Sequence, residues 1–299
     1  MANCLVTGGA GFIGSNIVDR LIKDGHNVSI IDNLSTGKEE NINPKAKFFK
    51  VDITSPDAAA AFKDVNVVFH TAAKARVQPS IEDPVGYCNV NTRGTLNMLK
   101  MAADAGAKRF VYSASSSAYG TPRNLPQKET EPTDPLSPYG VQKLVGELYS
   151  TMFNKVYGLE TVSLRYFNVY GERQVLKGAY SLVMGIFANQ ALNGEPMTIY
   201  GDGEQRRDFT YVGDVVDANV RAAFSEKVGN GEVINVGNGD NRSVNQLADM
   251  IGGERVHLEP RIEPMATLAD NSKARELLGW KPTMKIEDWV VGYKKDLGL

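Results

Sequence analysis

This chain contains few of the residues that build metal centres or disulfide frameworks. Its 299 residues include two cysteines, Cys4 and Cys88, and three scattered histidines. No grouping of these residues has the spacing of a metal site. The sequence therefore predicts no metal centre, and we expect both cysteines to be buried free thiols.

An excess of one charge and a long apolar segment are also missing. The chain has 33 Lys and Arg against 35 Asp and Glu, a net charge of −2, which gives no electrostatic basis for binding nucleic acid or an anionic membrane. No segment approaches the ~20 apolar residues that cross a bilayer, and no basic leader precedes the first strand-like segment. We expect a cytoplasmic protein that binds neither nucleic acid nor membrane.

The amino-terminal half alternates short apolar runs with helical patterns, which is typical of a parallel sheet covered by helices on both faces. Strands are expected at 3–7, 27–32, 47–51, 65–70, 109–113 and 160–166, and helices at 12–23, 84–105, 138–157 and 286–297. Beyond residue 168 the pattern is less regular. We predict an α/β fold with a doubly wound parallel sheet over residues 1–167, rejoined by the chain around 208–240, and a smaller substrate-binding region over 168–299.

A glycine pattern lies between the first expected strand and the first expected helix. Gly8, Gly11 and Gly14 have the spacing GxxGxxG, which permits a tight turn and a close approach to a pyrophosphate at a helix amino terminus. Asp32 ends the second strand, where its carboxylate can accept hydrogen bonds from both ribose hydroxyls. Because that carboxylate would repel a 2′-phosphate, the sequence favours NAD over NADP. Residues 52–53, after the third strand, either border the adenine or form a solvated strand end.

Tyr139 and Lys143 lie one turn apart on the expected helix 138–157, which begins after the good N-cap Ser137. Such a pair is common on helix surfaces, but here it follows a strand that ends in serines and shares a sheet with the nucleotide loop. A phenol titrates near ~10, and a nearby ammonium with an oxidised nicotinamide lowers its pKa. We predict that Tyr139 takes a hydroxyl proton as hydride leaves the same carbon, while a serine holds the substrate oxygen.

Seven longer segments extend these motifs over nearly the whole chain: Thr7–Gly14, Asp32–Gly37, Asp52–Ile53, Ser113–Gly120, Tyr139–Lys143, Arg165–Gly171 and Gly201–Phe209. Together they resemble the extended short-chain dehydrogenase/reductase family, and within it the pattern is most similar to that of UDP-glucose 4-epimerases. The resemblance implies a Rossmann-type sheet, NAD as the cofactor and a UDP-sugar as the substrate. It also implies a homodimer joined through the helices near 84–105 and 138–157.

The resemblance also implies roles for individual residues. The family's catalytic serine lies five positions before the glycine of a Tyr-Gly pair, which here is Ser115, so the implied catalytic group is Ser115, Tyr139 and Lys143. The implied NAD contacts are Gly8, Gly11, Phe12, Ile13, Gly14, Asp32, Asn33, Ser35, Thr36, Gly37, Asp52, Ile53, Ala72 and Lys143. The implied substrate contacts are Ser115, Ser116, Tyr139, Asn168, Arg207, Arg261 and Thr267.

Four of these substrate contacts lie in the second half of the chain. Asn168 would contact the diphosphate or the sugar, and Arg207 would offer a fork-shaped donor to phosphate oxygens, although without the family Arg206 and Arg207 are simply two exposed charges. A second diphosphate arginine is expected at Arg261, where the chain is one residue shorter than the family's usual run. Thr267 would flank the C2 substituent of the sugar, and its small side chain predicts that UDP-N-acetylglucosamine is accepted besides UDP-glucose.

The serines at 115–117 separate this chain from two other branches of the family. Sugar-nucleotide dehydratases carry a Thr-Asp-Glu cluster there, and UDP-glucuronate decarboxylases usually place a glutamate at the position of Ser117. Epimerisation at C4 needs neither acid, so the sequence favours it. UDP-glucuronate epimerisation or decarboxylation is the nearer alternative. A non-catalytic NAD-sensing regulator is the farther one, and the intact Tyr139 and Lys143 argue against it. The sequence leaves open whether Arg76 contacts substrate or solvent.

Overall fold

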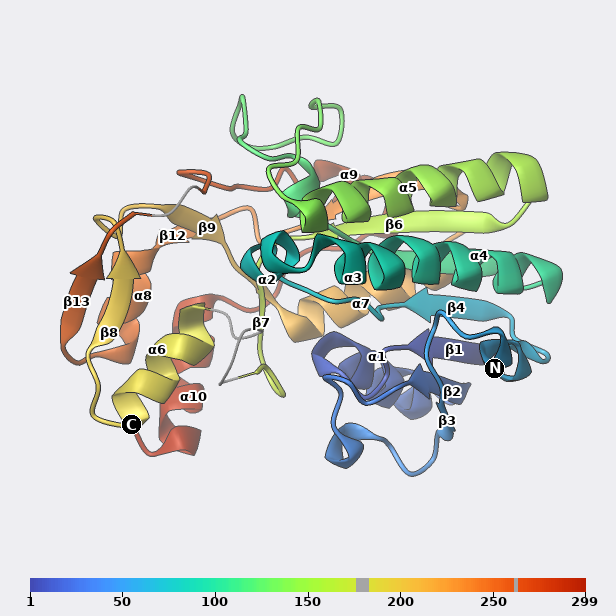
Figure 1. Cartoon of the computed structure of the whole chain (residues 1–299), viewed down its shortest axis with the longest axis horizontal. Coiled ribbons are helices and arrows are strands. Elements are labelled where there is room, and N and C mark those ends of the chain that lie inside the picture. The colour runs from blue at the N-terminus through green and yellow to red at the C-terminus, as the bar shows by residue number, and fades with distance from the viewer. Residues whose placement is uncertain (176–182, 261–262) are drawn as a thin grey trace.

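The fold is built on one central sheet. The computed structural model describes residues 1–175, 183–260 and 263–299, and in it seven parallel strands pair in the order β11-β6-β5-β4-β1-β2-β3 (Figure 1). Their bounds are β1 Asn3–Thr7, β2 Asn27–Asp32, β3 Lys47–Lys50, β4 Val67–His70, β5 Arg109–Ser115, β6 Glu160–Tyr166 and β11 Asn230–Val236. The predicted Rossmann-type class is confirmed. The strand order reverses between β1 and β4, and ligands of such sheets bind beyond the carboxyl ends of the strands at that point.

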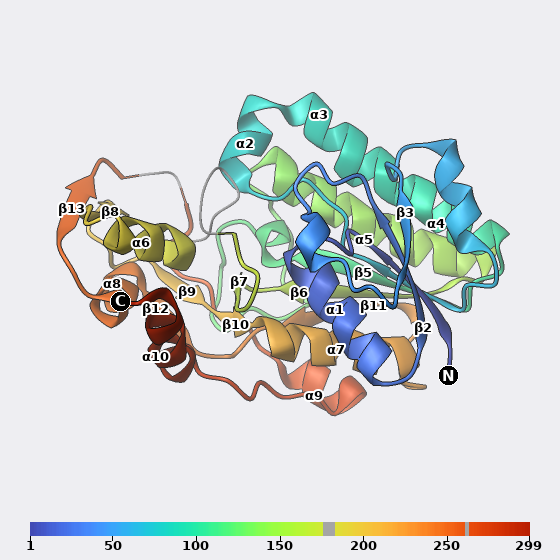
Figure 2. The same cartoon turned by 90° about the horizontal axis from the view of Figure 1, so that it is seen from below.

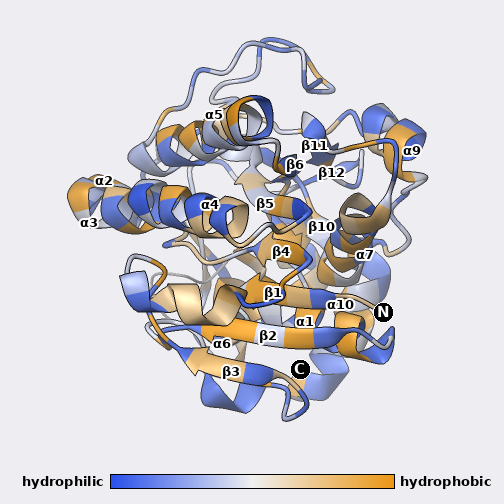
Figure 3. Ribbon diagram, turned by 90° about the vertical axis from the view of Figure 1, so that its right-hand side faces the viewer, coloured by the Kyte–Doolittle hydropathy of each residue, from blue (hydrophilic) through white to orange (hydrophobic). Residues whose placement is uncertain are grey.

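Helices cover both faces of the sheet. On one face lie α1 (Phe12–Lys23) and α7 (Val212–Phe224), and on the other α4 (Thr95–Asp104) and α5 (Pro138–Tyr157). Successive side chains of β1 alternate between two buried apolar clusters, since Cys4 and Val6 pack on the α1 side and Leu5 on the other. Figure 3 shows the apolar strands β1, β2 and β4 in the middle of these layers.

The smaller region lies to one side of the sheet (Figure 1, Figure 2). It contains α6 Val183–Leu192, α8 Val244–Ile251 and α10 Ile286–Leu297, with the strand pairs β8 Met197–Tyr200 with β13 Arg255–Leu258 and β9 Arg206–Asp208 with β12 Asn241–Ser243. The pair β7 Val169–Tyr170 with β10 Thr210–Tyr211 connects it to the sheet. The remaining helices are α2 Val77–Glu82, α3 Pro84–Cys88 and α9 Ser272–Leu278, and the 3₁₀ turns are Glu39–Asn41, Pro56–Phe62 and Ser116–Ala118. None of the described helices is long and apolar enough to cross a membrane.

The helix predicted over 84–105 is confirmed as a continuous helical run over 84–104, in which a π-helical turn at Asn89–Gly94 joins α3 to α4. The turn contains Asn91, which is buried and bonds to the main chain of Lys74 rather than lying along the helix surface. Hydrophobic periodicity does not report such a long-range bond, so the turn was not predicted. The prediction that both cysteines are buried is wrong, since Cys88 is exposed and only Cys4 is buried.

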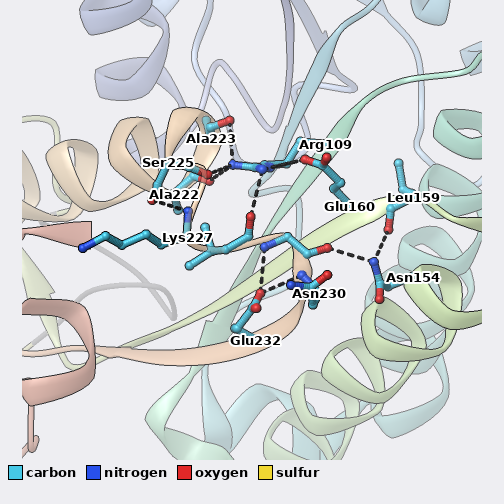
Figure 4. Close-up of polar contacts among 12 residues, drawn as sticks. Arg109, Asn154, Leu159, Glu160, Ala222, Ala223, Ser225, Lys227, Asn230 and Glu232 are labelled. Carbon is cyan, nitrogen blue, oxygen red and sulfur yellow. Dashed lines mark hydrogen bonds and ion pairs between the residues drawn. The ribbon is translucent and has the colours of Figure 1, made fainter. Parts of the chain in front are cut away.

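A buried arginine closes the amino edge of the sheet (Figure 4). Arg109 begins β5 and is 5% exposed. Its guanidinium bonds to Glu160 at the start of β6. It also donates to four carbonyls in the last turn of α7 and in the segment between α7 and β11, those of Ala222, Ala223, Ser225 and Val228. Nearby, Glu232 accepts the N–H groups of Gly229 and Asn230. This network joins a helix end to three strands.

Candidate active site

The glycine loop leaves no room for side chains. Gly8 has φ +72°, and a Cβ on Gly14 would lie 2.1 Å from the carbonyl oxygen of Gly8. Gly11 precedes α1 and provides no side-chain cap for the helix. The first turn of α1 therefore presents its N–H groups at the carboxyl edge of the sheet, in a loop whose backbone a phosphate can approach.

Asp32 is fixed beside this loop. Its Oδ2 accepts the N–H of Ala10 at 3.0 Å and its Oδ1 accepts that of Leu34 at 2.8 Å. Gly37 packs over the carboxylate, because a Cβ there would lie 2.9 Å from Asp32 Oδ2. Each carboxylate oxygen retains a second acceptor position. The glycine cradle and this carboxylate fit the pyrophosphate and ribose of NAD.

The other predicted NAD contacts surround the same edge. Asn33 donates to Asp52 Oδ2 at 2.6 Å. Burial raises the pKa of Asp52, but hydrogen bonds from Thr54 and Asn33 outweigh it and lower that pKa. Ile53 is buried, and Ala72 bonds to Thr7 beside the loop. Phe12 and Ile13 are half-buried, whereas Ser35 and Thr36 are exposed.

Ser115 and Tyr139 meet at the end of β5. Ser115 is the last residue of that strand, and its hydroxyl bonds to the side chain of Ser117 at 3.1 Å and to the phenol of Tyr139. Tyr139 lies in the first turn of α5, which is capped by Ser137. The helix packs closely on the turn after β5, since a Cβ on Gly140 would lie 2.7 Å from the carbonyl oxygen of Ser117. Ser116, in that turn, is half-buried.

Lys143 lies one turn further along α5 and is 5% exposed. Its Nζ donates to the carbonyl of Ser113 at 2.7 Å and lies 5.1 Å from the ring centroid of Tyr112. Burial lowers the pKa of Lys143 to about 8, although the carboxylate of Glu147 opposes that shift. Glu147 is itself paired with buried Arg165 at 2.7 Å.

The lowering of the Tyr139 pKa by the Lys143 ammonium together with an oxidised nicotinamide stays a prediction. In the protein by itself, burial raises the pKa of Tyr139, and the influences that oppose the rise are the hydrogen bond with Ser115 and the positive charge of Arg76. The ammonium of Lys143 donates to the carbonyl of Ser113. Sequence reasoning left the role of Arg76 open, because no local pattern connects a residue before α2 with the start of α5.

Two predicted substrate contacts lie around β9. The Nδ2 of Asn168 donates to the carbonyl of Asp208 at 3.0 Å, and the Oγ1 of Thr267 accepts the N–H of Asp208 at 3.3 Å. Thr267 is 8% exposed. Asp208 was not among the predicted contacts, although it lies within the segment Gly201–Phe209. Its carboxylate accepts three further N–H groups, those of Asn238, Gly239 and Ala269.

The arginines of this region are held by other side chains. Arg207 pairs with Glu263 at 2.5 Å, and Arg206 donates to Asn241 at 2.8 Å. Both arginines are half-buried, so the alternative of two exposed charges is wrong. Both lie on β9, which pairs with β12. Arg261 lies outside the described residues.

Fold and site together define a class. A Rossmann-type sheet, a glycine cradle, an acidic residue after β2 and the group Ser115, Tyr139 and Lys143 are the parts of an NAD-dependent enzyme of the short-chain dehydrogenase/reductase type.

Comparison with known proteins agrees with this class and narrows it. Residues 4–237 match the NAD dependent epimerase/dehydratase family. The UDP-glucose 4-epimerase of Mycolicibacterium smegmatis is 39% identical over 96% of this chain and 95% of its own. The chain therefore belongs to the NAD-dependent epimerase/dehydratase family, and its cofactor is NAD.

Two solved structures share the whole fold. The UDP-glucose 4-epimerase of Thermotoga maritima, solved with UDP-glucose, is 40% identical over 99% of both chains with a TM-score of 0.93. The UDP-N-acetylglucosamine 4-epimerase of Methanobrevibacter ruminantium, solved with UDP-N-acetylmuramic acid, is 40% identical over 97% of this chain and 96% of its own, with a TM-score of 0.91.

Proposed function

We propose that this enzyme interconverts the C4 epimers of a UDP-hexose, with UDP-glucose and UDP-galactose as one substrate pair. The observation that carries the proposal is the group of Ser115, Tyr139 and Lys143 beside a dinucleotide cradle, with Ser117 where a decarboxylase usually has glutamate. The names of the relatives support the same reaction class.

In this reaction Tyr139 accepts the proton of the C4 hydroxyl and later returns it, while Ser115 holds the C4 oxygen. When bound, oxidised NAD would supply a reversible hydride acceptor for C4. Lys143 carries its positive charge within the same buried group. Because the cofactor is regenerated in each turnover, we expect it to copurify with the protein.

Substrate contacts are proposed on the sugar-nucleotide side. Arg207 would exchange its partner Glu263 for the diphosphate, which accepts the same forked donor geometry. Asn168 would contact the diphosphate or the sugar, and Arg261 would supply a second cation. Thr267 leaves space at C2, so we propose that UDP-N-acetylglucosamine is also converted, as the name of one relative suggests for that relative.

One assay separates these functions. Purified protein is incubated without added cofactor with UDP-glucose, UDP-N-acetylglucosamine or UDP-glucuronate, and the products are resolved by NMR. We expect 4-epimers from the first two. A 4-epimer of UDP-glucuronate, or its decarboxylated pentose, would replace the proposal with the nearer alternative. Net accumulation of reduced cofactor would indicate a dehydrogenase, and no conversion of any sugar would favour the NAD-sensing regulator.

A homodimer is proposed through α3, α4 and α5, which lie side by side on one face of the sheet (Figure 1). Apolar side chains on their outer surface support it, since Val85 is 79% exposed and Leu148 is 62% exposed. Burial of such side chains favours association. Leu148→Arg should give a monomer in size-exclusion chromatography with light scattering. Val291→Arg, on α10 at a position that is 73% exposed, should not. A monomeric wild type would refute this.

A further inference from the structure

Arg76 precedes α2 in a conformation that a non-glycine residue rarely adopts. Its φ is +94° and its ψ is 143°. A backbone conformation of this kind is strained and persists only where the surroundings hold it. Such strain is common at functional sites, and here it occurs on the loop beside the catalytic phenol.

The surroundings hold this loop by side-chain bonds to its main chain. Asn91 accepts the N–H of Lys74 at 2.8 Å and donates to the carbonyl of Lys74 at 2.9 Å. Tyr87 donates its hydroxyl to the carbonyl of Ala75 at 2.8 Å. Asn91 is 1% exposed and also donates to Gln142 of α5 at 3.0 Å. The residues before the strained position are therefore tied to α3, to the π-helical turn and to α5.

The same loop is attached to the start of α5. The N–H of Tyr139 donates to Ser80 Oγ at 3.2 Å, and Ser80 Oγ donates to the carbonyl of Val77 at 2.6 Å. Arg76 and Tyr139 are electrostatic neighbours, because the charge of each shifts the pKa of the other toward the ionised form. A guanidinium keeps its proton even when burial lowers its pKa, so Arg76 is a lasting positive charge beside the phenol.

Lys143 is a second cation in this cluster, and its ammonium donates to the carbonyl of Ser113. Burial lowers the pKa of His70 to about 3, so its ring is neutral. Burial raises the pKa of Tyr112, which leaves that phenol protonated at neutral pH. Further titratable or polar groups near this cluster include Ser115 on β5, Glu147 on α5, which pairs with Arg165, and Tyr87 on α3.

We propose that Arg76 is a further positioning residue of this enzyme, whose guanidinium stabilises the negative charge on the Tyr139 oxygen so that Tyr139 can accept the C4 proton at neutral pH. That the proton comes from the C4 hydroxyl of a sugar rests on the proposed epimerase function. The ionisation of Tyr139 itself is a property of the folded protein and needs no substrate.

The test compares three variants of the NAD-bound enzyme. Arg76→Gly removes the charge and suits the positive φ, which favours folding. Arg76→Lys keeps the charge, and Lys74→Ala removes a charge from the same loop that pairs with Asp83 at the surface. The readouts are the pH profile of kcat and the titration of the Tyr139 ring carbon in protein made with labelled tyrosine, assigned with Tyr139→Phe.

We expect Arg76→Gly to raise the titration midpoint of Tyr139 and the acid limb of kcat by about one pH unit, and to lower kcat at pH 7 by about tenfold. Arg76→Lys should restore most of the titration midpoint and most of kcat. Lys74→Ala should match the wild type in both quantities. A purely structural role would change the melting temperature or KM without moving the midpoint. If Arg76→Gly does not fold, Arg76→Gln replaces it in both measurements.

An unchanged Tyr139 midpoint in the charge-removing variant overturns the proposal. The titration also separates it from the proposed function. A shifted midpoint in a protein that epimerises no UDP-hexose would leave the role of Arg76 intact and refute the epimerase. Epimerisation of a UDP-hexose together with an unshifted Tyr139 midpoint would refute the role of Arg76 and leave the proposed epimerase function intact.

Discussion

The two edges of the central sheet use buried charge differently. At the amino edge, Arg109 donates to four carbonyls and pairs with Glu160. At the carboxyl edge, Lys143 donates to one described carbonyl, that of Ser113, and burial moves its pKa to about 8. The acceptors around Arg109 satisfy the donors of its buried guanidinium. A buried charge with few partners titrates closer to neutral pH, as a group used in chemistry requires.

Replacing the catalytic phenol should have the largest effect. Tyr139→Phe removes the hydroxyl that exchanges the C4 proton but keeps the ring, so kcat should fall by at least ~100-fold. Copurified NAD and the melting temperature should be unchanged, and both are measured with the turnover. Turnover within a few fold of the wild type would remove Tyr139 from the mechanism.

At the opposite edge, Arg109→Met should reduce stability without affecting chemistry. The change leaves four carbonyls without their donor, so the free energy of unfolding should fall by about 3 kcal/mol in urea titrations. The folded variant should retain the kcat of the wild type. Arg20→Met is the control, because Arg20 forms a surface pair at 36% exposure and should lose less than ~0.5 kcal/mol. Equal losses in the two variants would contradict the comparison.

Burial of the Lys143 ammonium should make the free energy of unfolding depend on pH. Its pKa is about 8 when folded, against 10.5 for an ordinary lysine, so between these values the unfolded state binds the extra proton. The wild type should therefore gain stability relative to Lys143→Met as pH rises, by about 2 kcal/mol from pH 8 to about 9.5. Urea titrations of both proteins across this range measure the difference. A constant difference would show that the ammonium is not destabilised by burial.

The smallest effect is expected at the cofactor carboxylate. Asp32→Asn keeps the shape of the side chain but removes the charge that accepts ribose hydroxyls, so NAD affinity should fall by about tenfold. Calorimetry on protein stripped of cofactor gives the two dissociation constants. The ratio of the NADP dissociation constant to the NAD dissociation constant should fall at the same time. Unchanged affinity for both cofactors would place the ribose elsewhere.

Much of the fold follows from local patterns. The predicted bounds of β1, β2, β6, α1, α5 and α10 agree with the structure, because buried apolar runs, caps and prolines act over a few residues. The π-helical turn at Asn89–Gly94 and the exposure of Cys88 were not predicted. Both features depend on which other segments of the chain pack against the helix. The periodicity of the helix's own residues carries no information about those segments.

The amino-acid sequence alone determined the glycine cradle and the spacing of Tyr139 and Lys143, because turn geometry and the helical repeat set both over a few residues. Only the tertiary structure decided that Lys143 is directed at Ser113 and that Arg76 lies beside Tyr139. Those contacts join segments separated by at least 30 residues, and packing of the sheet and its helices, rather than any local preference, brings them together.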